Sequence, residues 1–358
     1  MSLTWTYGWL GIAVFAFGLV LYHLLLKFLK SPGKKNQSGE LLIRWSDQAK
    51  PTIGGIGFFV AFLAGSAFSG WLGLEALPQL PILPLVTAGC IAFLSGLYDD
   101  ANNTRPVVKL ISQAACALII VFSGIEITIL DMPIADRILT VVWIMAMMNS
   151  LNMLDNMDAV TSLVSTGVLV FCSVAMFWLG DGDSGIMALV ISMIAVLVAF
   201  LRFNWHPSKM FMGDSGSQLL GLLLAVLAIP YGWNLARGFD VLTDWITAPL
   251  TIGLVFLIPL CDTTIVSINR LSHGRSPMVG GRDHTTHNLV YCGFKDQHVA
   301  MLYGALTVVN IFLAYQLSFG HNNRLWMIWL SVVYMLIVFF TLFVISRRNL
   351  SRGKYSYS

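Results

Sequence analysis

The stretch GIMALVISMIAVLVAFLRF, residues 185–203, contains a single charged side chain, Arg202. A helix that crosses the hydrocarbon core of a membrane needs about 20 mostly apolar residues, and this stretch meets that requirement. Similar stretches recur along the chain, and none shows the alternation of short barrel strands. They lie at 5–29, 56–74, 81–98, 107–125, 137–155, 159–179, 185–203, 216–232, 246–269, 299–318 and 325–346. We therefore expect an all-α polytopic membrane protein with about eleven transmembrane helices.

The composition of the whole chain agrees with this expectation. Of its 358 residues, 57% are hydrophobic and only 11% are charged, whereas soluble domains average roughly 45–50% apolar and about 25% charged residues. A disordered chain is excluded as well, because disorder needs low hydrophobicity and high charge. The net charge of +3 is too small to indicate a partner made of nucleic acid. The five cysteines form no CxxC pair, so neither a zinc knuckle nor a disulfide framework is indicated.

The lysine and arginine residues orient the predicted helices. Cytosolic loops of membrane proteins carry an excess of these residues, and the first connection, 30–50, contains five of them. If this connection is cytosolic, 18 of the 21 cationic side chains lie on the cytosolic side, and the exceptions are Arg137, Arg237 and Arg324. Misplacing one helix would reverse every later loop and remove the asymmetry. We therefore expect the N-terminus outside the cell and the C-terminus in the cytosol.

Five polar stretches lie at the predicted cytosolic ends of the helices. They are 50–57 (KPTIGGIG), 96–102 (GLYDDAN), 149–158 (NSLNMLDNMD), 203–217 (FNWHPSKMFMGDSGS) and 270–287 (RLSHGRSPMVGGRDHTTH). Each alone has an ordinary explanation as a helix entry, a helix cap, an interhelical hydrogen bond or a solvated loop. Ionisable groups near the membrane core are nevertheless expensive and indicate function by default. The orientation was derived from lysine and arginine alone, yet all five stretches lie on the predicted cytosolic side. Their clustering predicts a site there for a polyanion and a divalent cation.

The adjacent aspartates Asp99 and Asp100 suit phosphate chemistry. Two neighbouring carboxylates repel each other, which raises the pKa of one of them or recruits a cation. Such a pair can bind a metal ion or accept a proton from a phosphate or hydroxyl, although alone it could equally be a polar helix terminus. Lys109 follows on the next predicted helix, where a lysine either meets a phosphate or extends its ammonium group to the membrane surface.

The other stretches add groups that bind cations and anions. Helical spacing puts Asn152 and Asp155 on one face of a helix. The GDSGS segment, 213–217, leads into a helix, so it offers backbone N–H groups to an anion. It also offers the carboxylate of Asp214 to Mg²⁺, which binds through one or two carboxylates plus substrate phosphates. The loop 270–298 combines basic, imidazole and glycine residues, which is typical of an anion-binding loop, whereas a zinc site there lacks a third strong ligand.

In their order along the chain, these stretches resemble the polyprenyl-phosphate N-acetylhexosamine-1-phosphate transferases. The matching residues are 51–55 (PTIGG), Asp99-Asp100, 149–158, 203–217 and 282–287 (RDHTTH). The resemblance implies that a UDP-N-acetylhexosamine and a polyprenyl phosphate give a polyprenyl-diphospho-sugar and UMP, with Mg²⁺ or alternatively Mn²⁺. Phosphoryl transfer of this kind is catalysed mainly by positioning and charge neutralisation. A phosphate monoester dianion needs no general base, so we favour direct attack over a covalent aspartyl intermediate.

The resemblance also implies roles for individual residues. Asp214 would hold Mg²⁺ with Asn152 as the second protein ligand, Asp99 and Asp100 would lie beside the acceptor phosphate, and Lys109 would neutralise phosphate charge. Phe211 would stack on uracil, with Asp158 and Asn204 near it. The donor diphosphate or sugar would be contacted by Arg282, His284 and His287. The full set of substrate-binding residues is Lys50, Thr52, Asp155, Asp158, Asn204, Phe211, Arg282, His284 and His287.

Two departures from the family pattern bear on the substrate. Residues 155–159 read DNMDA where the family usually has DGxDG, and two threonines separate the histidines that are consecutive in the peptidoglycan branch. We therefore expect transfer of N-acetylglucosamine-1-phosphate that initiates cell-envelope polysaccharide synthesis. The alternative within the family is a peptidoglycan-branch phospho-MurNAc-pentapeptide transferase. The alternative of another class is a membrane transporter of an anionic or nucleotide-linked solute, but transporters place their sites near the bilayer midplane.

The orientation and the resemblance together predict the setting of the site. We expect one integral-membrane catalytic domain over residues 1–358, in the plasma (inner) membrane, with its active site on the cytosolic face. The loop 270–298 is expected to contribute to that site. The expected partners are a UDP-N-acetylhexosamine, a polyprenyl phosphate lipid and the membrane, and a homodimer is possible.

Overall fold

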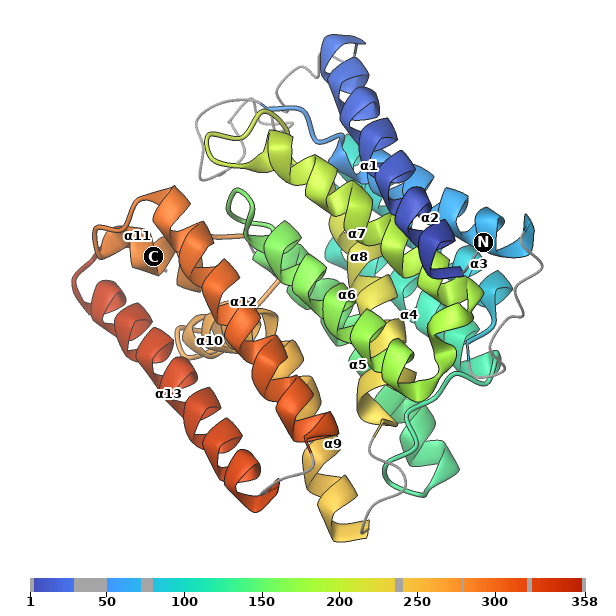
Figure 1. Ribbon diagram of the computed structural model, residues 1–358. Coiled ribbons are helices and arrows are strands. Elements are labelled where there is room, and N and C mark those ends of the chain that lie inside the picture. The colour runs from blue at the N-terminus through green and yellow to red at the C-terminus, as the bar shows by residue number, and fades with distance from the viewer. Residues whose placement is uncertain are drawn as a thin grey trace.

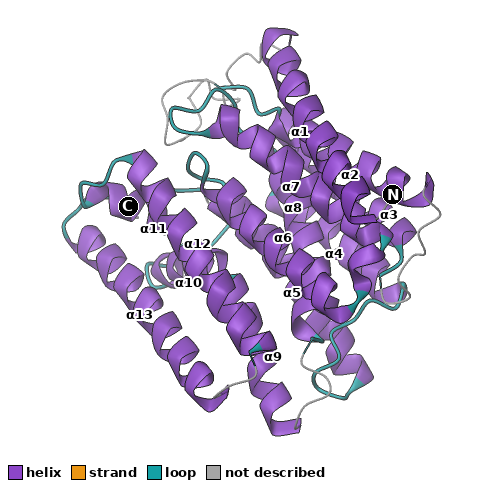
Figure 2. Ribbon diagram, in the orientation of Figure 1, coloured by secondary structure: helices purple, strands orange, loops and turns teal. Residues whose placement is uncertain are grey.

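The computed structural model describes residues 3–28, 50–71, 80–235, 241–278, 280–320 and 324–355 (Figure 1). Within these ranges every named element is a helix (Figure 2), and the one pairing of extended backbone is an isolated bridge between Thr52 and Phe211. The prediction of an all-α protein is therefore confirmed. The lysines and arginine at 30–44 and Arg237, which helped to orient the chain, lie outside the described residues.

The helices follow one another with short connections. They are α1 (Leu3–Phe28), α2 (Gly54–Trp71), α3 (Ile82–Asn102), α4 (Pro106–Phe122), α5 (Pro133–Leu154), α6 (Val160–Leu179), α7 (Gly185–Asn204), α8 (Gly213–Ala228), α9 (Val241–Val255), α10 (Leu257–Leu271), α11 (Thr285–Tyr291), α12 (Asp296–Phe319) and α13 (Arg324–Ser351). A 3-10 turn, η1 (Asp181–Asp183), precedes α7, and a π-helical turn, η2 (Ile229–Trp233), extends α8.

Eight helices of the described part are long and apolar enough to cross a membrane. They are α1, α3, α5, α6, α7, α8 with its η2 extension, α12 and α13. The predicted stretch 246–269 is instead two helices, α9 and α10, which are bent by 81° at a short break. Pro259 lies in the first turn of α10 and has no backbone N–H. It therefore cannot continue the helical hydrogen bonds of α9 into α10, which accounts for a break at this place. The predicted stretches 56–74 and 107–125 are the shorter apolar helices α2 and α4. The chain is thus a multi-pass membrane protein.

The centre of the bundle is α8, which packs against α2, α3 and α5. Its sequence from Leu219 to Ala228 is apolar on every side, which is typical of a helix surrounded by other helices. At Gly221 an added Cβ would lie only 2.6 Å from Cα of Met148 on α5, so only glycine permits the close approach of the two backbones. α1 and α13, at opposite edges of the bundle (Figure 1), are mostly exposed and apolar, as lipid-facing helices are.

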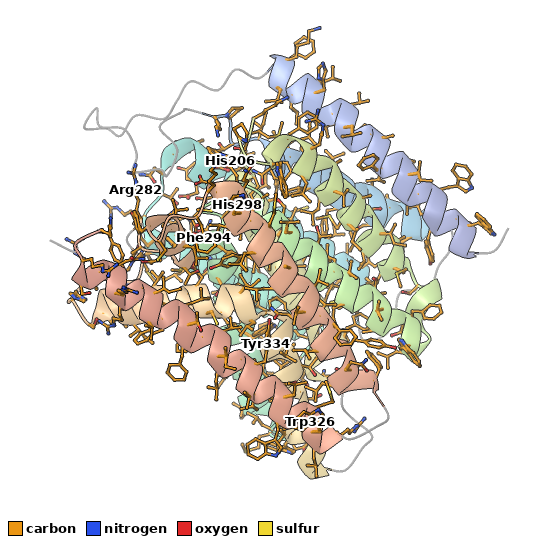
Figure 3. The ribbon with its side chains drawn as sticks, turned by 60° about the vertical axis from the view of Figure 1, so that its left-hand side comes forward. His206, Arg282, Phe294, His298, Trp326 and Tyr334 are labelled. Atoms are coloured by element: carbon orange, nitrogen blue, oxygen red, sulfur yellow. The ribbon has the colours of Figure 1, made fainter. Side chains whose placement is uncertain are left out.

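One end of this bundle gathers the polar residues. The C-termini of α3, α5, α7 and α10 meet the N-termini of α4 and α8 at this end, as expected when neighbouring helices run antiparallel. His206 and Arg282 lie there, whereas Trp326 lies at the far end of the bundle (Figure 3). The helical arrangement therefore brings the five polar stretches of the sequence to one place.

Candidate active site

A cavity of about 850 Å³ opens at the polar end of the bundle. Its wall comes from α3, α4, α5, α10 and the first residues of α8, α11 and α12. The segment before α2, the turn after α5, the connection between α7 and α8, and the segment before α11 complete it. Of the site residues predicted from the sequence, all but Asn204 line it. The lining residues among them are Lys50, Thr52, Asp99, Asp100, Lys109, Asn152, Asp155, Asp158, Phe211, Asp214, Arg282, His284 and His287.

Lys109 joins two carboxylates from different helices. Its Nζ lies 3.0 Å from Oδ2 of Asp99, near the end of α3, and 3.0 Å from Oδ2 of Asp214, in the first turn of α8. The other oxygen of Asp99 accepts hydrogen bonds from the backbone N–H, at 2.7 Å, and the hydroxyl of Thr104. The turn between α3 and α4 thus fixes Asp99 so that one of its oxygens faces the lysine.

Asp100 caps the N-terminus of α8 from the neighbouring helix. Its Oδ2 accepts the backbone N–H of Ser215 at 3.0 Å, which satisfies one of the free donors at a helix start. Gly213 makes this approach possible because it takes a positive φ of 76°, and a Cβ there would lie 2.5 Å from the same oxygen. The adjacent aspartates therefore differ in their surroundings, since Asp99 faces an ammonium group and Asp100 faces a helix N-terminus.

A layer of side-chain amides supports Asp214 from α5. The Nδ2 group of Asn152 donates to Oδ1 of Asp214 at 2.8 Å and to Oγ of Ser217 at 2.9 Å. Deeper in the bundle, Gln113 donates to Gln218 at 3.0 Å and accepts from Asn149 on α5. Gln218 is a site residue that was not expected from the sequence, and the signal that could have found it is a lone amide in the apolar sequence of α8.

The carboxylates fit a divalent cation that arrives with phosphate ligands. Asp99, Asp100 and Asp214 bring three carboxyl groups near the single ammonium group of Lys109, so the acidic groups outnumber the cation. Among the described residues no three His, Cys, Asp or Glu side chains form a complete metal-binding group. Mg²⁺ does not need one, because it binds proteins through one or two carboxylates and takes its remaining ligands from substrate phosphates and water.

The connection between α7 and α8 pairs with the residues before α2. Phe211 donates its N–H to Pro51 and accepts from Gly54, both at 3.0 Å, which forms the bridge opposite Thr52. Above the ring of Phe211, Nζ of Lys50 lies 5.3 Å from the centroid, within cation–π range. The pairing therefore holds an aromatic face and a cation together on the cavity wall.

Asp158 and Asn204 join the turn between α5 and α6 to the connection between α7 and α8, beside this aromatic face. Asp158 accepts the N–H and hydroxyl of Ser208 at 3.0 and 2.8 Å. Asn204 is buried: it accepts from the N–H of Ala159 at 2.9 Å and donates to the carbonyl of Met210 at 3.1 Å. The structure therefore places Asn204 behind the wall, where it holds the two turns together. Ala159 takes a positive φ of 67°, a conformation that favours the glycine of the usual family pattern.

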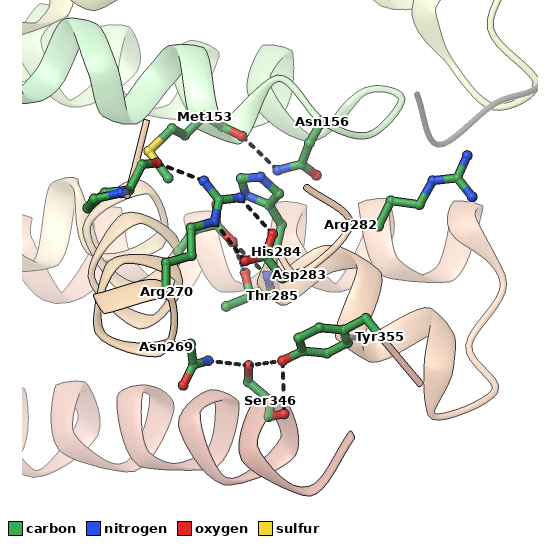
Figure 4. A network of polar contacts seen from close by, with 12 residues as sticks. Met153, Asn156, Asn269, Arg270, Arg282, Asp283, His284, Thr285, Ser346 and Tyr355 are labelled. Carbon is green, nitrogen blue, oxygen red and sulfur yellow. Dashed lines mark hydrogen bonds and ion pairs between the residues drawn. The ribbon is translucent and has the colours of Figure 1, made fainter. Parts of the chain in front are cut away.

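The segment between α10 and α11 is fixed by a buried ion pair (Figure 4). Arg270, at the end of α10, binds both oxygens of Asp283 at 2.8 and 2.6 Å and donates to the carbonyl of Pro277 at 2.7 Å. Such a bidentate pair fixes geometry as well as charge. Arg282 points away from this group (Figure 4). Arg270 was expected only as one of the basic residues of the loop 270–298, because its pairing with Asp283 depends on the fold.

His287 follows on α11 and also lines the cavity. Burial, with a smaller contribution from the neighbouring His284, lowers the pKa of His287 to about 3. Its imidazole is therefore neutral near pH 7, so it contributes a hydrogen-bonding group and no charge.

Comparisons with known proteins show which sequences this chain resembles. A family model described as glycosyl transferase family 4 matches residues 82–232. The chain is 26% identical to a probable undecaprenyl-phosphate N-acetylglucosaminyl 1-phosphate transferase of Bacillus subtilis, over 82% of this chain and 79% of the relative. It is 26% identical to the undecaprenyl-phosphate alpha-N-acetylglucosaminyl 1-phosphate transferase of Escherichia coli K12, over 72% and 70%. It is 27% identical to a decaprenyl-phosphate N-acetylglucosaminephosphotransferase of Mycolicibacterium smegmatis, over 61% of this chain and 59% of the relative.

The ion pairs of Lys109 generate a stability prediction. Replacing Lys109 with Met leaves two partly buried carboxylates without their shared cation, and we expect the free energy of unfolding to fall by about 1–3 kcal/mol. The matched control is Arg137→Met, which removes an exposed pair with Glu126 and should cost less than about 1 kcal/mol. Thermal unfolding in detergent with EDTA measures both variants. Equal stabilities for the two would contradict the arrangement.

Proposed function

We propose that the chain is a member of glycosyl transferase family 4, whose model matches residues 82–232, and that it transfers N-acetylglucosamine-1-phosphate from UDP-N-acetylglucosamine to a polyprenyl phosphate. The products are a polyprenyl-diphospho-N-acetylglucosamine and UMP, and the lipid product begins cell-envelope polysaccharide synthesis. The observation that carries the proposal is the convergence of Asp99, Asp214 and Lys109 on a cavity that Phe211 and Arg282 also line.

The cavity has groups for both reacting phosphates. An oxygen of the acceptor phosphate attacks the sugar-linked phosphorus of the donor, and the bond from that phosphorus to UMP breaks. Mg²⁺ (or Mn²⁺), when held by Asp214 and Asn152, would supply positive charge to the donor diphosphate. Lys109 neutralises phosphate charge, while Asp99 and Asp100 orient the acceptor side. Since the acceptor is a dianion near pH 7, its attack is direct and uses no covalent intermediate.

The donor has a matching subsite on the other wall. Phe211 offers its ring to uracil, Lys50 lies over that ring, and Asp158 lies 4.0 Å from the ammonium group of Lys50. Arg282 and His284, from the segment before α11, approach the diphosphate or the sugar. Thr52, Asp155 and His287 line the remaining wall. Binding the nucleotide and the lipid phosphate to one charged end of the bundle is the positioning that phosphoryl transfer requires.

We also propose the placement of this domain in the membrane. Adding the bent pair α9–α10 and the shorter helices α2 and α4 to the eight long helices gives eleven spans. With the N-terminus outside, the polar end faces the cytosol, where UDP-sugars are made, and the membrane is the plasma membrane. The loop 270–298 then belongs to the same single domain.

The alternatives have less support. The names of the relatives specify N-acetylglucosamine, which disfavours the peptidoglycan-branch reading. A transporter would place its site near the middle of the membrane, whereas this cavity lies at one end of the helices.

The reaction gives the first functional prediction. Purified protein, UDP-N-acetylglucosamine, undecaprenyl phosphate and Mg²⁺ should yield UMP, and EDTA should stop its release. Asp214→Asn should lower kcat at least about 100-fold, because a charge-stabilising group at the reacting phosphates is worth roughly that factor. Asp181→Asn, at the other end of the bundle, is the matched control and should keep wild-type activity.

The contradicting outcomes for this assay are specific. Absence of UMP with any UDP-N-acetylhexosamine, with or without Mg²⁺, would refute the enzyme. Full activity of Asp214→Asn would refute its proposed role while leaving the reaction intact.

The topology gives a second prediction. In a Cys292→Ser background, Arg282→Cys should resist a membrane-impermeant maleimide added to intact cells and should react after the cells are opened. Met132→Cys, in the exposed segment before α5 at the opposite end, should react in intact cells. Labelling of residue 282 from outside would reverse the proposed orientation.

A further inference from the structure

A buried carboxylate on α10 has no role in the reaction as described so far. Asp262 is fully buried, 0% exposed, and it is the only acidic or basic residue of the predicted stretch 246–269. An ionisable group in such a position is costly unless it is paired and hydrogen-bonded. Its partners therefore indicate what the carboxylate is for.

Three hydrogen bonds reach the carboxylate of Asp262 from the segment that begins α11. Nδ1 of His284 lies 2.8 Å from Oδ2, and the N–H and hydroxyl of Thr285 donate to Oδ1 at 2.7 and 2.6 Å. The hydroxyl of Tyr303 on α12 donates to the hydroxyl oxygen of Thr285 at 2.8 Å, which leaves the Thr285 proton for Asp262. Three converging donors match an ionised carboxylate.

This arrangement determines which nitrogen of His284 is available. Nδ1 faces Asp262, so the hydrogen bond to the carboxylate puts a proton on Nδ1. Nε2 is then the nitrogen left for a ligand in the cavity that His284 lines. Two other groups beside His284 are paired and one is neutral: Arg270 and Asp283 pair with each other, and burial keeps the neighbouring His287 neutral.

We propose that Asp262 is a positioning residue for the donor substrate, which holds His284 with Nε2 directed at an anionic oxygen of the donor diphosphate. The inference rests on the proposed function. To donate from Nε2 while Nδ1 keeps its proton, His284 must be an imidazolium, and the buried carboxylate compensates that charge. The pair therefore supplies a cation of fixed orientation, which a flexible lysine would not.

The test is Asp262→Asn. Asparagine keeps the size and can still accept from Thr285, but it presents an N–H group to Nδ1 of His284, which must then be an acceptor. His284 is left neutral and without its partner charge. We expect the KM for UDP-N-acetylglucosamine to rise about 10- to 100-fold, the range found when the partner that orients a ligating histidine is lost. The KM for the polyprenyl phosphate should stay unchanged.

Two further measurements separate positioning from a purely structural role. In a His284→Gln background, Asp262→Asn should add no further loss, because it acts through His284. Asp136→Asn, which replaces another buried aspartate at the far end of the bundle, should leave both KM values unchanged. If Asp262→Asn does not fold, Thr285→Val, which removes one donor to the carboxylate, should show the same selective rise in the donor KM.

The contradicting results are distinct from failure of the proposed function. Wild-type KM values in Asp262→Asn, an equal rise for both substrates, or full additivity with His284→Gln would overturn the positioning role. Absence of turnover by the wild-type protein would instead overturn the proposed function itself.

Discussion

The site depends on charge compensation at the end of a membrane bundle. Asp99 and Asp214 come from different helices, and each lies 3.0 Å from the ammonium group of Lys109. Without a cation between them, two carboxylates this close would repel each other across a poorly solvated wall. The lysine stabilises the arrangement but is outnumbered by acidic groups, and this is the basis on which we propose a second cation that arrives with the phosphates.

The fold provides this arrangement through helix ends. α8 is enclosed by other helices along its length, and its N-terminus emerges among the ends of α3, α4 and α5. Close glycine contacts permit this: a Cβ at Gly96 would lie 2.4 Å from the carbonyl oxygen of Asp214, and one at Gly55 would lie 2.4 Å from the nitrogen of Gly216. Dense packing around α8 therefore determines where the carboxylates lie, and the exposed helices α1 and α13 contribute little to the site.

The positions of most long helices and of the polar site could be predicted, because a helix that crosses a membrane must be long and apolar. The stretch 185–203 differs from α7 by one residue, and the polar stretches stood out against apolar surroundings. What could not be predicted depends on contacts between distant residues. Asn204 was expected at the substrate but joins two turns behind the wall, and the break between α9 and α10 lay inside one apolar stretch. The pairs Arg270–Asp283 and Asp262–His284 likewise form only when the segment before α11 folds back on α10.

The central claim is that the excess negative charge around Asp214 holds a divalent cation together with the donor diphosphate. Titration of the purified protein with Mn²⁺, followed by electron paramagnetic resonance with and without UDP-N-acetylglucosamine, tests it most directly. The account predicts that the nucleotide sugar tightens Mn²⁺ binding to the wild-type protein and that Asp214→Asn abolishes this effect. Mn²⁺ binding that is the same in both proteins, with the nucleotide sugar present, would contradict it.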